Sequence, residues 1–151
     1  MVVIGSDHGG LELKASVSEA LRQRGLEVVD LGTDNDDSVD YPDFAEKVAG
    51  SVSRGEAACG ILVCGTGIGM SIVANKFPGV RAALVTDEYM ARMAKEHNNA
   101  NVLVLGGRVL EAMSAARIVS VWLDAVFAGG RHQRRLDKIA QLEAAVRAGK
   151  L

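Results

Sequence analysis

Short apolar runs alternate with longer segments of helical periodicity along this chain, and this alternation constrains the fold more than any other feature. The apolar runs span residues 2–4, 26–31, 60–63, 81–85 and 102–105. The periodic segments lie at residues 14–24, 89–96, 110–123 and 134–147. Strands that alternate with helices pair in parallel, and strands that are apolar throughout are covered by helices on both faces. We therefore predict a Rossmann-like three-layer α/β/α sandwich with a roughly five-stranded parallel sheet.

Length and composition are those of one globular domain, which we take as residues 1–151. Hydrophobic residues make up 48% of the chain and charged residues 24%, which suits one sizeable core. The last two periodic segments follow each other without a strand, and residues 125–130 end in two glycines that favour a turn. We expect the final helix to pack on the outside of the domain or on another subunit.

Charge and hydropathy exclude several classes of partner. With 17 basic and 19 acidic residues the formal net charge is -2, so nothing favours nucleic acid or an anionic membrane surface. No apolar run approaches the roughly 20 residues of a membrane span, and residues 1–7 lack the basic and apolar regions of a signal peptide. We expect a cytoplasmic protein.

Polar residues follow several of the apolar runs, at the strand ends where ligands bind in an open parallel sheet. Residues 6–10 read S-D-H-G-G, residues 40–43 in the loop after the second run read D-Y-P-D, and residues 64–69 read C-G-T-G-I-G. The glycines at 65, 67 and 69 lead into a helix predicted to begin near Met70, so their amides and the helix dipole can converge on an anion. The spacing matches neither the dinucleotide fingerprint nor the P-loop. We interpret this loop as an oxyanion or phosphate cradle, with a simple tight turn as the alternative.

Two residues are candidates for proton transfer. Cys64 stands where the N-terminal amides of a helix stabilise a thiolate, so it is a candidate base or nucleophile, or else a small core residue. We interpret Cys59 as a core residue, and its odd separation from Cys64 points the two thiols to opposite faces of the strand, which argues against a disulfide. His97 follows a predicted helix and is either a proton carrier or a C-terminal cap of that helix.

The start of the last helix is basic. Arg131 and Arg135 are four residues apart and project from the same helix face, where two guanidinium groups could clamp a phosphate. A solvated basic face is the alternative.

Five motifs together resemble the type B ribose-5-phosphate isomerase and galactose-6-phosphate isomerase family. They are S-D-H-G-G at 6–10, D-Y-P-D at 40–43, C-G-T-G-I-G-M-S-I-V-A-N-K at 64–76, E-H-N-N-A-N at 96–101 and G-G-R-H-Q-R-R at 129–135. The likeness covers nearly the whole chain. It implies an aldose-ketose isomerase that opens the ring of a sugar phosphate and works through a cis-enediol, without a metal or nicotinamide cofactor. D-ribose 5-phosphate and D-ribulose 5-phosphate, in the non-oxidative pentose phosphate pathway, are the implied substrates.

The resemblance also implies a role for each candidate residue. Cys64 would move the proton between C1 and C2, with Thr66 handling hydroxyl protons, while His97 assisted by Asp7 would open the ring. The implied substrate-binding residues are His8, Tyr41, Gly65, Gly67, Gly69, Asn98, Arg108, Arg131 and Arg135. In the family the site is shared between subunits, with the group of His97, Asn98 and Arg108 contributed by the neighbour. A homodimer, or a dimer of dimers, is therefore implied.

Three alternatives remain at this point. One is the same chemistry on a six-carbon sugar phosphate, such as allose 6-phosphate or galactose 6-phosphate. Another is a nucleotide-binding regulatory domain, against which the missing G-x-G-x-x-G counts. The third is an inactive subunit of a hetero-oligomer, against which Cys64, Thr66 and His97 together count. One branch of the family has serine in place of the cysteine and glutamate in place of Met70, so this chain resembles the cysteine branch.

Overall fold

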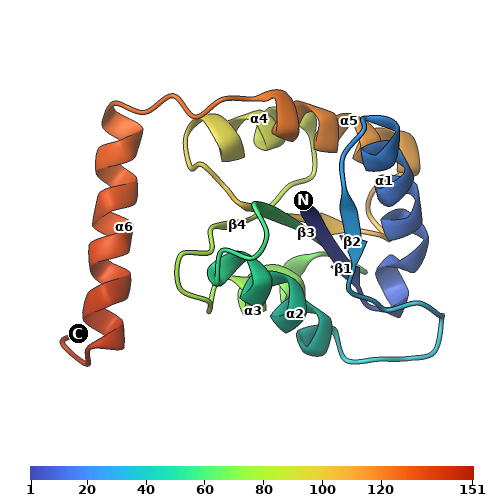
Figure 1. Cartoon of the computed structure of the whole chain (residues 1–151), viewed down its shortest axis with the longest axis horizontal. Helices are drawn as coiled ribbons and strands as arrows, with labels where there is room; N and C mark the ends of the chain where they lie inside the picture. The colour runs from blue at the N-terminus through green and yellow to red at the C-terminus, as the bar shows by residue number, and fades with distance from the viewer.

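Five parallel strands form one sheet, in the order β2-β1-β3-β5-β4, in a computed structural model that describes residues 1–151. The strands are β1 (Val2–Ser6), β2 (Val28–Asp30), β3 (Cys59–Cys64), β4 (Ala82–Leu84) and β5 (Val102–Gly106). The helices are the short 3-10 helix η1 (His8–Gly10), α1 (Leu11–Gln23), α2 (Tyr41–Ser53), α3 (Ile68–Ala74), α4 (Glu88–Glu96), α5 (Ala112–Asp124) and α6 (Arg131–Arg147). Helices α1, α4 and α5 cover one face of the sheet and α2 and α3 the other (Figure 1). The predicted three-layer α/β/α sandwich is confirmed.

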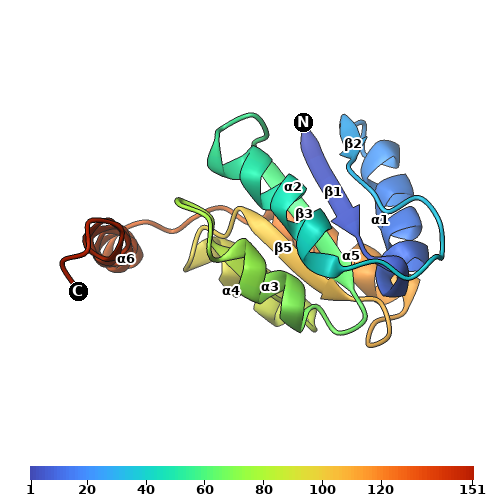
Figure 2. The same cartoon turned by 90° about the horizontal axis from the view of Figure 1, so that it is seen from below.

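Alternate side chains of each strand enter two separate cores. On β3, Ile61 and Val63 pack toward α1, α4 and α5, whereas Leu62 and Cys64 pack toward α2 and α3. Figure 2, seen from below, shows α2 and α3 in front of the strands and α5 behind them. Cys59 packs against the core opposite to that of Cys64, and both thiols are free, as the odd spacing predicts. Trp122 of α5 is fully buried in the core that α5 shares with α1 and α4.

Helix α2 differs from the sequence prediction, which placed Tyr41 and its neighbours in a loop. Tyr41 instead begins α2, and Pro42 occupies its first turn, where a missing backbone N–H costs no hydrogen bond. Ala45, Val48 and Ala49 then bury one face of the helix against the sheet.

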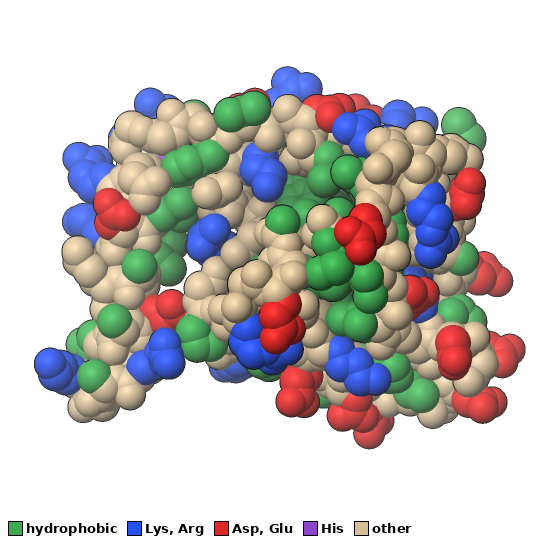
Figure 3. Space-filling model, in the orientation of Figure 1, with side chains coloured by type: hydrophobic (Ala, Val, Ile, Leu, Met, Phe, Trp, Pro, Cys, Tyr) green, Lys and Arg blue, Asp and Glu red, His purple; other side chains and the backbone are tan.

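Helix α6 stands apart from the sandwich at the end of an extended segment, residues 125–130 (Figure 1). This agrees with a position outside the domain. Its apolar residues Ile139, Leu142 and Val146 face β4 and α4 across a cavity of about 790 Å³, yet remain 50 to 57% exposed. The space-filling view shows an open gap between α6 and the rest of the molecule (Figure 3). No helix combines the length and the apolar character that crossing a membrane requires.

Candidate active site

The loops that follow β1, β3 and β5 interlock at the carboxyl edge of the sheet. Gly107 N–H donates to the Cys64 carbonyl at 2.7 Å, and Arg108 N–H donates to the Gly65 carbonyl at 2.9 Å. A Cβ atom on Gly107 would lie 2.6 Å from the Gly9 carbonyl oxygen, so only glycine permits this approach. The three loops therefore form one surface, and the residues on it share one site.

Cys64 lies at the entrance to the glycine loop. The residue is 5% exposed, and its Sγ accepts a hydrogen bond from the Gly67 N–H at 3.2 Å. Gly67 has a φ of 81°, a left-handed conformation that suits glycine, and it caps α3 at the point where the chain turns into the helix. The sulfur therefore sits beside the N-terminus of α3, among amide donors that can also receive an oxyanion.

Three more candidates line the same edge. Tyr41 packs over the first turn of α3 so closely that a Cβ atom on Gly69 would lie 2.5 Å from its ring. The Asp7 carboxylate accepts the Gly10 N–H at 3.1 Å. His8 Nδ1 accepts the Val39 N–H at 3.1 Å, so the neutral imidazole carries its proton on Nε2, which is left to donate to a ligand.

Arg108 belongs to this edge as well, which corrects one implication of the resemblance. A Cβ atom placed on Gly65 or on Gly9 of the same chain would lie 3.1 or 3.3 Å from a guanidinium nitrogen of Arg108. The reason is topological, because Arg108 follows β5, which pairs with β3 and ends at the same edge as Cys64. Within this chain, Arg108 thus lies with Cys64 and not with His97.

The remaining candidates lie at the amino edge of the sheet. His97 caps the C-terminus of α4, which confirms for its backbone the predicted role as a helix cap. The chain then enters β5 at Val102. Val102 pairs with Gly60 at one end of β3, whereas Gly106 pairs with Cys64 at the other end, four residues or about 13 Å away. One chain therefore does not bring His97 to its own Cys64.

The start of α6 accompanies His97. The Ala128 N–H donates to the Glu96 carbonyl at 2.9 Å, and the His132 ring stacks on the His97 ring with centroids 4.1 Å apart. Arg131 and Arg135 flank this stack and are exposed in a single chain. Burial lowers the pKa of His132, and the neighbouring His97 and arginine cations lower it further.

The structure thus divides the predicted site residues into two groups. The carboxyl-edge group consists of Asp7, His8, Tyr41, Cys64, Gly65, Thr66, Gly67, Gly69 and Arg108. The amino-edge group consists of His97, Asn98, Arg131 and Arg135. No three His, Cys, Asp or Glu side chains gather in a way that could hold a metal ion.

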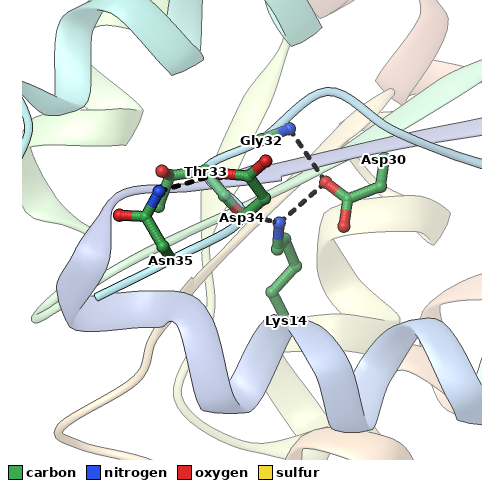
Figure 4. A network of polar contacts seen from close by, with 6 residues as sticks. All are labelled: Lys14, Asp30, Gly32, Thr33, Asp34 and Asn35. Atoms are coloured by element: carbon green, nitrogen blue, oxygen red, sulfur yellow. Dashed lines mark hydrogen bonds and ion pairs between the residues drawn. The ribbon is translucent and has the colours of Figure 1, made fainter. Parts of the chain in front are cut away.

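Sequence reasoning missed Lys14, which fixes the loop after β2 (Figure 4). The side chain is 3% exposed, and Nζ donates to the Asp30 carboxylate at 2.7 Å and to the Thr33 carbonyl. The same carboxylate accepts the Gly32 N–H at 2.8 Å, and Thr33 N–H donates to the Ser6 carbonyl at 2.6 Å. The network joins the end of β2 to the end of β1, next to Asp7 and His8. The signal in the sequence is a lysine within the apolar stripe of α1.

Lys14→Met should destabilise the fold by about 1–3 kcal/mol, because the buried Thr33 carbonyl loses its donor and Asp30 loses its cation. Urea denaturation followed by circular dichroism measures the change. Lys138→Met, on the exposed surface of α6, is the matched control and should stay within about 0.5 kcal/mol of the unsubstituted protein. Equal stability of the two variants would contradict this role of Lys14.

Comparison with known proteins gives one consistent result. The profile of the family described as Ribose/Galactose Isomerase matches residues 2–139. The chain is 45% identical to ribose-5-phosphate isomerase B of Escherichia coli over 142 residues, which cover 94% of this chain and 95% of that protein. It is 47% identical to a putative sugar phosphate isomerase of Bacillus subtilis, with 94% and 96% covered.

Solved structures agree with the sequence relatives. Ribose-5-phosphate isomerase B of Clostridium thermocellum superposes with a TM-score of 0.94 at 54% identity, covering 96% of this chain and 98% of that one. Ribose-5-phosphate isomerase B of Mycoplasma genitalium, solved with bound ribulose-5-phosphate, superposes with a TM-score of 0.91 at 48% identity, covering 95% of each chain.

Proposed function

The chain belongs to the ribose/galactose isomerase family, and we propose that it is an aldose-ketose isomerase that interconverts D-ribose 5-phosphate and D-ribulose 5-phosphate. The observation that carries the proposal is the Cys64 sulfur beside the glycine loop, where a base and a set of amide donors face the same space. Relatives named ribose-5-phosphate isomerase B support the choice of substrate. The proposed place of action is the cytoplasm, where charged sugar phosphates are retained.

Ring opening is the first proposed step. His97 donates a proton to the ring oxygen as the bond from that oxygen to C1 breaks. Asp7 takes the proton of the C1 hydroxyl, which becomes the aldehyde of the open-chain sugar. Since His97 and Asp7 of one chain lie at opposite edges of the sheet, the two groups come from different copies.

Proton transfer between C2 and C1 follows. The Cys64 thiolate removes the C2 proton, the electron pair forms the C1–C2 double bond, and negative charge moves to the C1 oxygen. The amides of the glycine loop stabilise this oxyanion, since their direction is set before the charge develops. Thr66 passes a proton between the two oxygens, and the Cys64 thiol returns its proton to C1, which yields the ketose.

The phosphate of the substrate would be bound by cationic side chains and N–H donors from both the carboxyl-edge group and the amino-edge group. At the carboxyl edge, His8 offers its Nε2–H and Arg108 its exposed guanidinium. Arg131 and Arg135 of a second copy would add charge-assisted hydrogen bonds. Tyr41 and Asn98 would contact the sugar.

We infer that the working unit is a homodimer in which the amino-edge group of each copy completes the carboxyl-edge group of the other. Two observations support this inference, namely the separation of the groups along β3 and the exposed apolar stripe of α6 beside an open cavity. Exposed apolar surface of this kind is typical of protein interfaces. A dimer of dimers would also place the amino-edge group of one copy beside the carboxyl-edge group of another.

The first experiment is an assay of the purified protein with ribose 5-phosphate, in which ribulose 5-phosphate formation is followed with and without a chelator. We expect turnover that the chelator leaves unchanged. Activity confined to allose 6-phosphate or galactose 6-phosphate would mean that the chain catalyses the same reaction on a six-carbon substrate. Inactivity on all of these substrates, together with a nucleotide-induced rise in melting temperature, would favour a nucleotide-binding domain and overturn the proposal.

A further inference from the structure

His97 at the end of α4 stacks on His132 at the start of α6, and this contact bears on ring opening. We propose that His132 is a positioning residue, which holds the His97 imidazole in the orientation for proton donation and links that orientation to the phosphate clamp. This inference rests on the proposed function. His132 is 6% exposed although the residues on either side of it are exposed, and its ring stacks on His97 at 4.1 Å with an interplanar angle of 12°.

The stack is the contact that fixes the plane of the His97 ring. The backbone of His97 is held by its N–H, which donates to the Met93 carbonyl at 2.9 Å, but its imidazole makes no hydrogen bond within the chain. An imidazole at the end of a helix is otherwise free to turn about its side-chain torsions. A flat partner restricts the ring to planes parallel to its own.

His132 is itself held firmly. The Ala128 N–H bonds to the Glu96 carbonyl, and the His132 N–H donates to the Gly129 carbonyl at 3.0 Å. Gly129 and Gly130 both have positive φ angles, 65° and 54°, which turn the chain so that α6 begins beside the end of α4. The stacking ring is therefore carried by the first turn of α6.

The first two turns of α6 also carry the proposed phosphate clamp. Arg131 directly precedes His132, and Arg135 lies one helical turn further along α6. A phosphate that binds these two guanidinium groups fixes the start of α6, and with it the ring that orients His97. Substrate binding would thus fix the orientation of His97, the proposed proton donor.

The charge state of His132 suits this role. Burial lowers its pKa, and the positive charges of His97, Arg131 and Arg135 lower it further, which favours the neutral form of His132. A neutral ring can stack on His97 while His97 carries the proton that it donates. Two imidazolium ions at this distance would repel each other.

Two substitutions and two assays test the proposal. His132→Ala removes the stacking ring, whereas His132→Phe keeps a flat ring without a titratable group. Turnover of ribose 5-phosphate requires ring opening. Exchange of the C1 proton of ribulose 5-phosphate with deuterium in D2O, followed by proton NMR, requires Cys64 but no ring, because this ketose phosphate is open-chain.

We expect His132→Ala to lower turnover of ribose 5-phosphate by about 10²-fold, as a misplaced catalytic group does, and to leave deuterium exchange within about two-fold. His132→Phe should recover most of the lost turnover. Size-exclusion chromatography checks that each variant keeps the assembly of the unsubstituted protein.

Three outcomes would overturn the inference: unchanged turnover in His132→Ala, an equal loss of turnover and exchange, or a His132→Phe variant as slow as His132→Ala. Failure of the proposed function is recognised separately. In that case the unsubstituted protein neither turns over ribose 5-phosphate nor exchanges the C1 proton of ribulose 5-phosphate.

Discussion

Cys64→Ala should lower the turnover number with ribose 5-phosphate by about 10²–10⁴-fold, the usual contribution of a general base. The Michaelis constant should change far less, because the substitution leaves His8, Arg108 and the glycine amides in place. Initial rates over a range of substrate concentrations separate the two parameters. Deuterium exchange into ribulose 5-phosphate should disappear in the same variant.

Cys59→Ala is the matched control for this substitution. The two cysteines begin and end the same strand, but Cys59 packs toward the opposite core and lies at the other edge of the sheet. Its removal should leave turnover within about two-fold, since surface or half-buried substitutions away from a site have small effects. A Cys64→Ala variant with full turnover and a raised Michaelis constant would contradict the base role.

Two inactive variants should regain activity when they are mixed. Cys64→Ala lacks the proposed base and His97→Ala lacks the proposed ring-opening acid, so we expect each variant alone to have little activity on ribose 5-phosphate. In a mixed dimer, one site combines both substitutions and the other combines the intact Cys64 of one copy with the intact His97 of the other. Random exchange makes half of the dimers mixed, so about a quarter of the normal activity should return in a two-fold symmetric assembly.

The recovery depends on the two edges of the sheet supplying one site from two chains. A mixture that stays inactive after the subunits have been unfolded and refolded together would contradict a shared site. A mixture of Cys64→Ala with Thr66→Ala is the control. Both of these substitutions fall in the carboxyl-edge group, so every mixed site lacks one of the two side chains and little activity should return.

Much of the fold follows from local patterns. Each of the five strands overlaps one of the apolar runs, because each run is too short for an amphipathic helix. Helix α2 was missed because D-Y-P-D has the composition of a turn, although Pro42 is well suited to the first turn of a helix. The stripe of Ala45, Val48, Ala49 and Val52 was the signal that could have identified it.

The division of the site into two groups was also partly available from the sequence. Arg108 follows the last strand and His97 precedes it, so the chain direction alone places them at opposite edges of a parallel sheet. The stack of His132 on His97 was not available, because it depends on the path of residues 125–130 and on where α6 begins. The burial of Lys14 likewise depends on how closely the loop after β2 approaches α1.

Helix α6 combines the proposed phosphate clamp with an exposed apolar stripe. Its first two turns carry Arg131 and Arg135, and its later turns carry the apolar residues Ile139, Leu142 and Val146, which are exposed in a single chain. Dilution that dissociates the copies would therefore remove the proton donor, half of the phosphate clamp and the cover of this apolar stripe together. With the proposed shared site, specific activity depends on protein concentration, and saturating substrate, which would bridge two chains, should shift the dissociation midpoint to lower protein concentration.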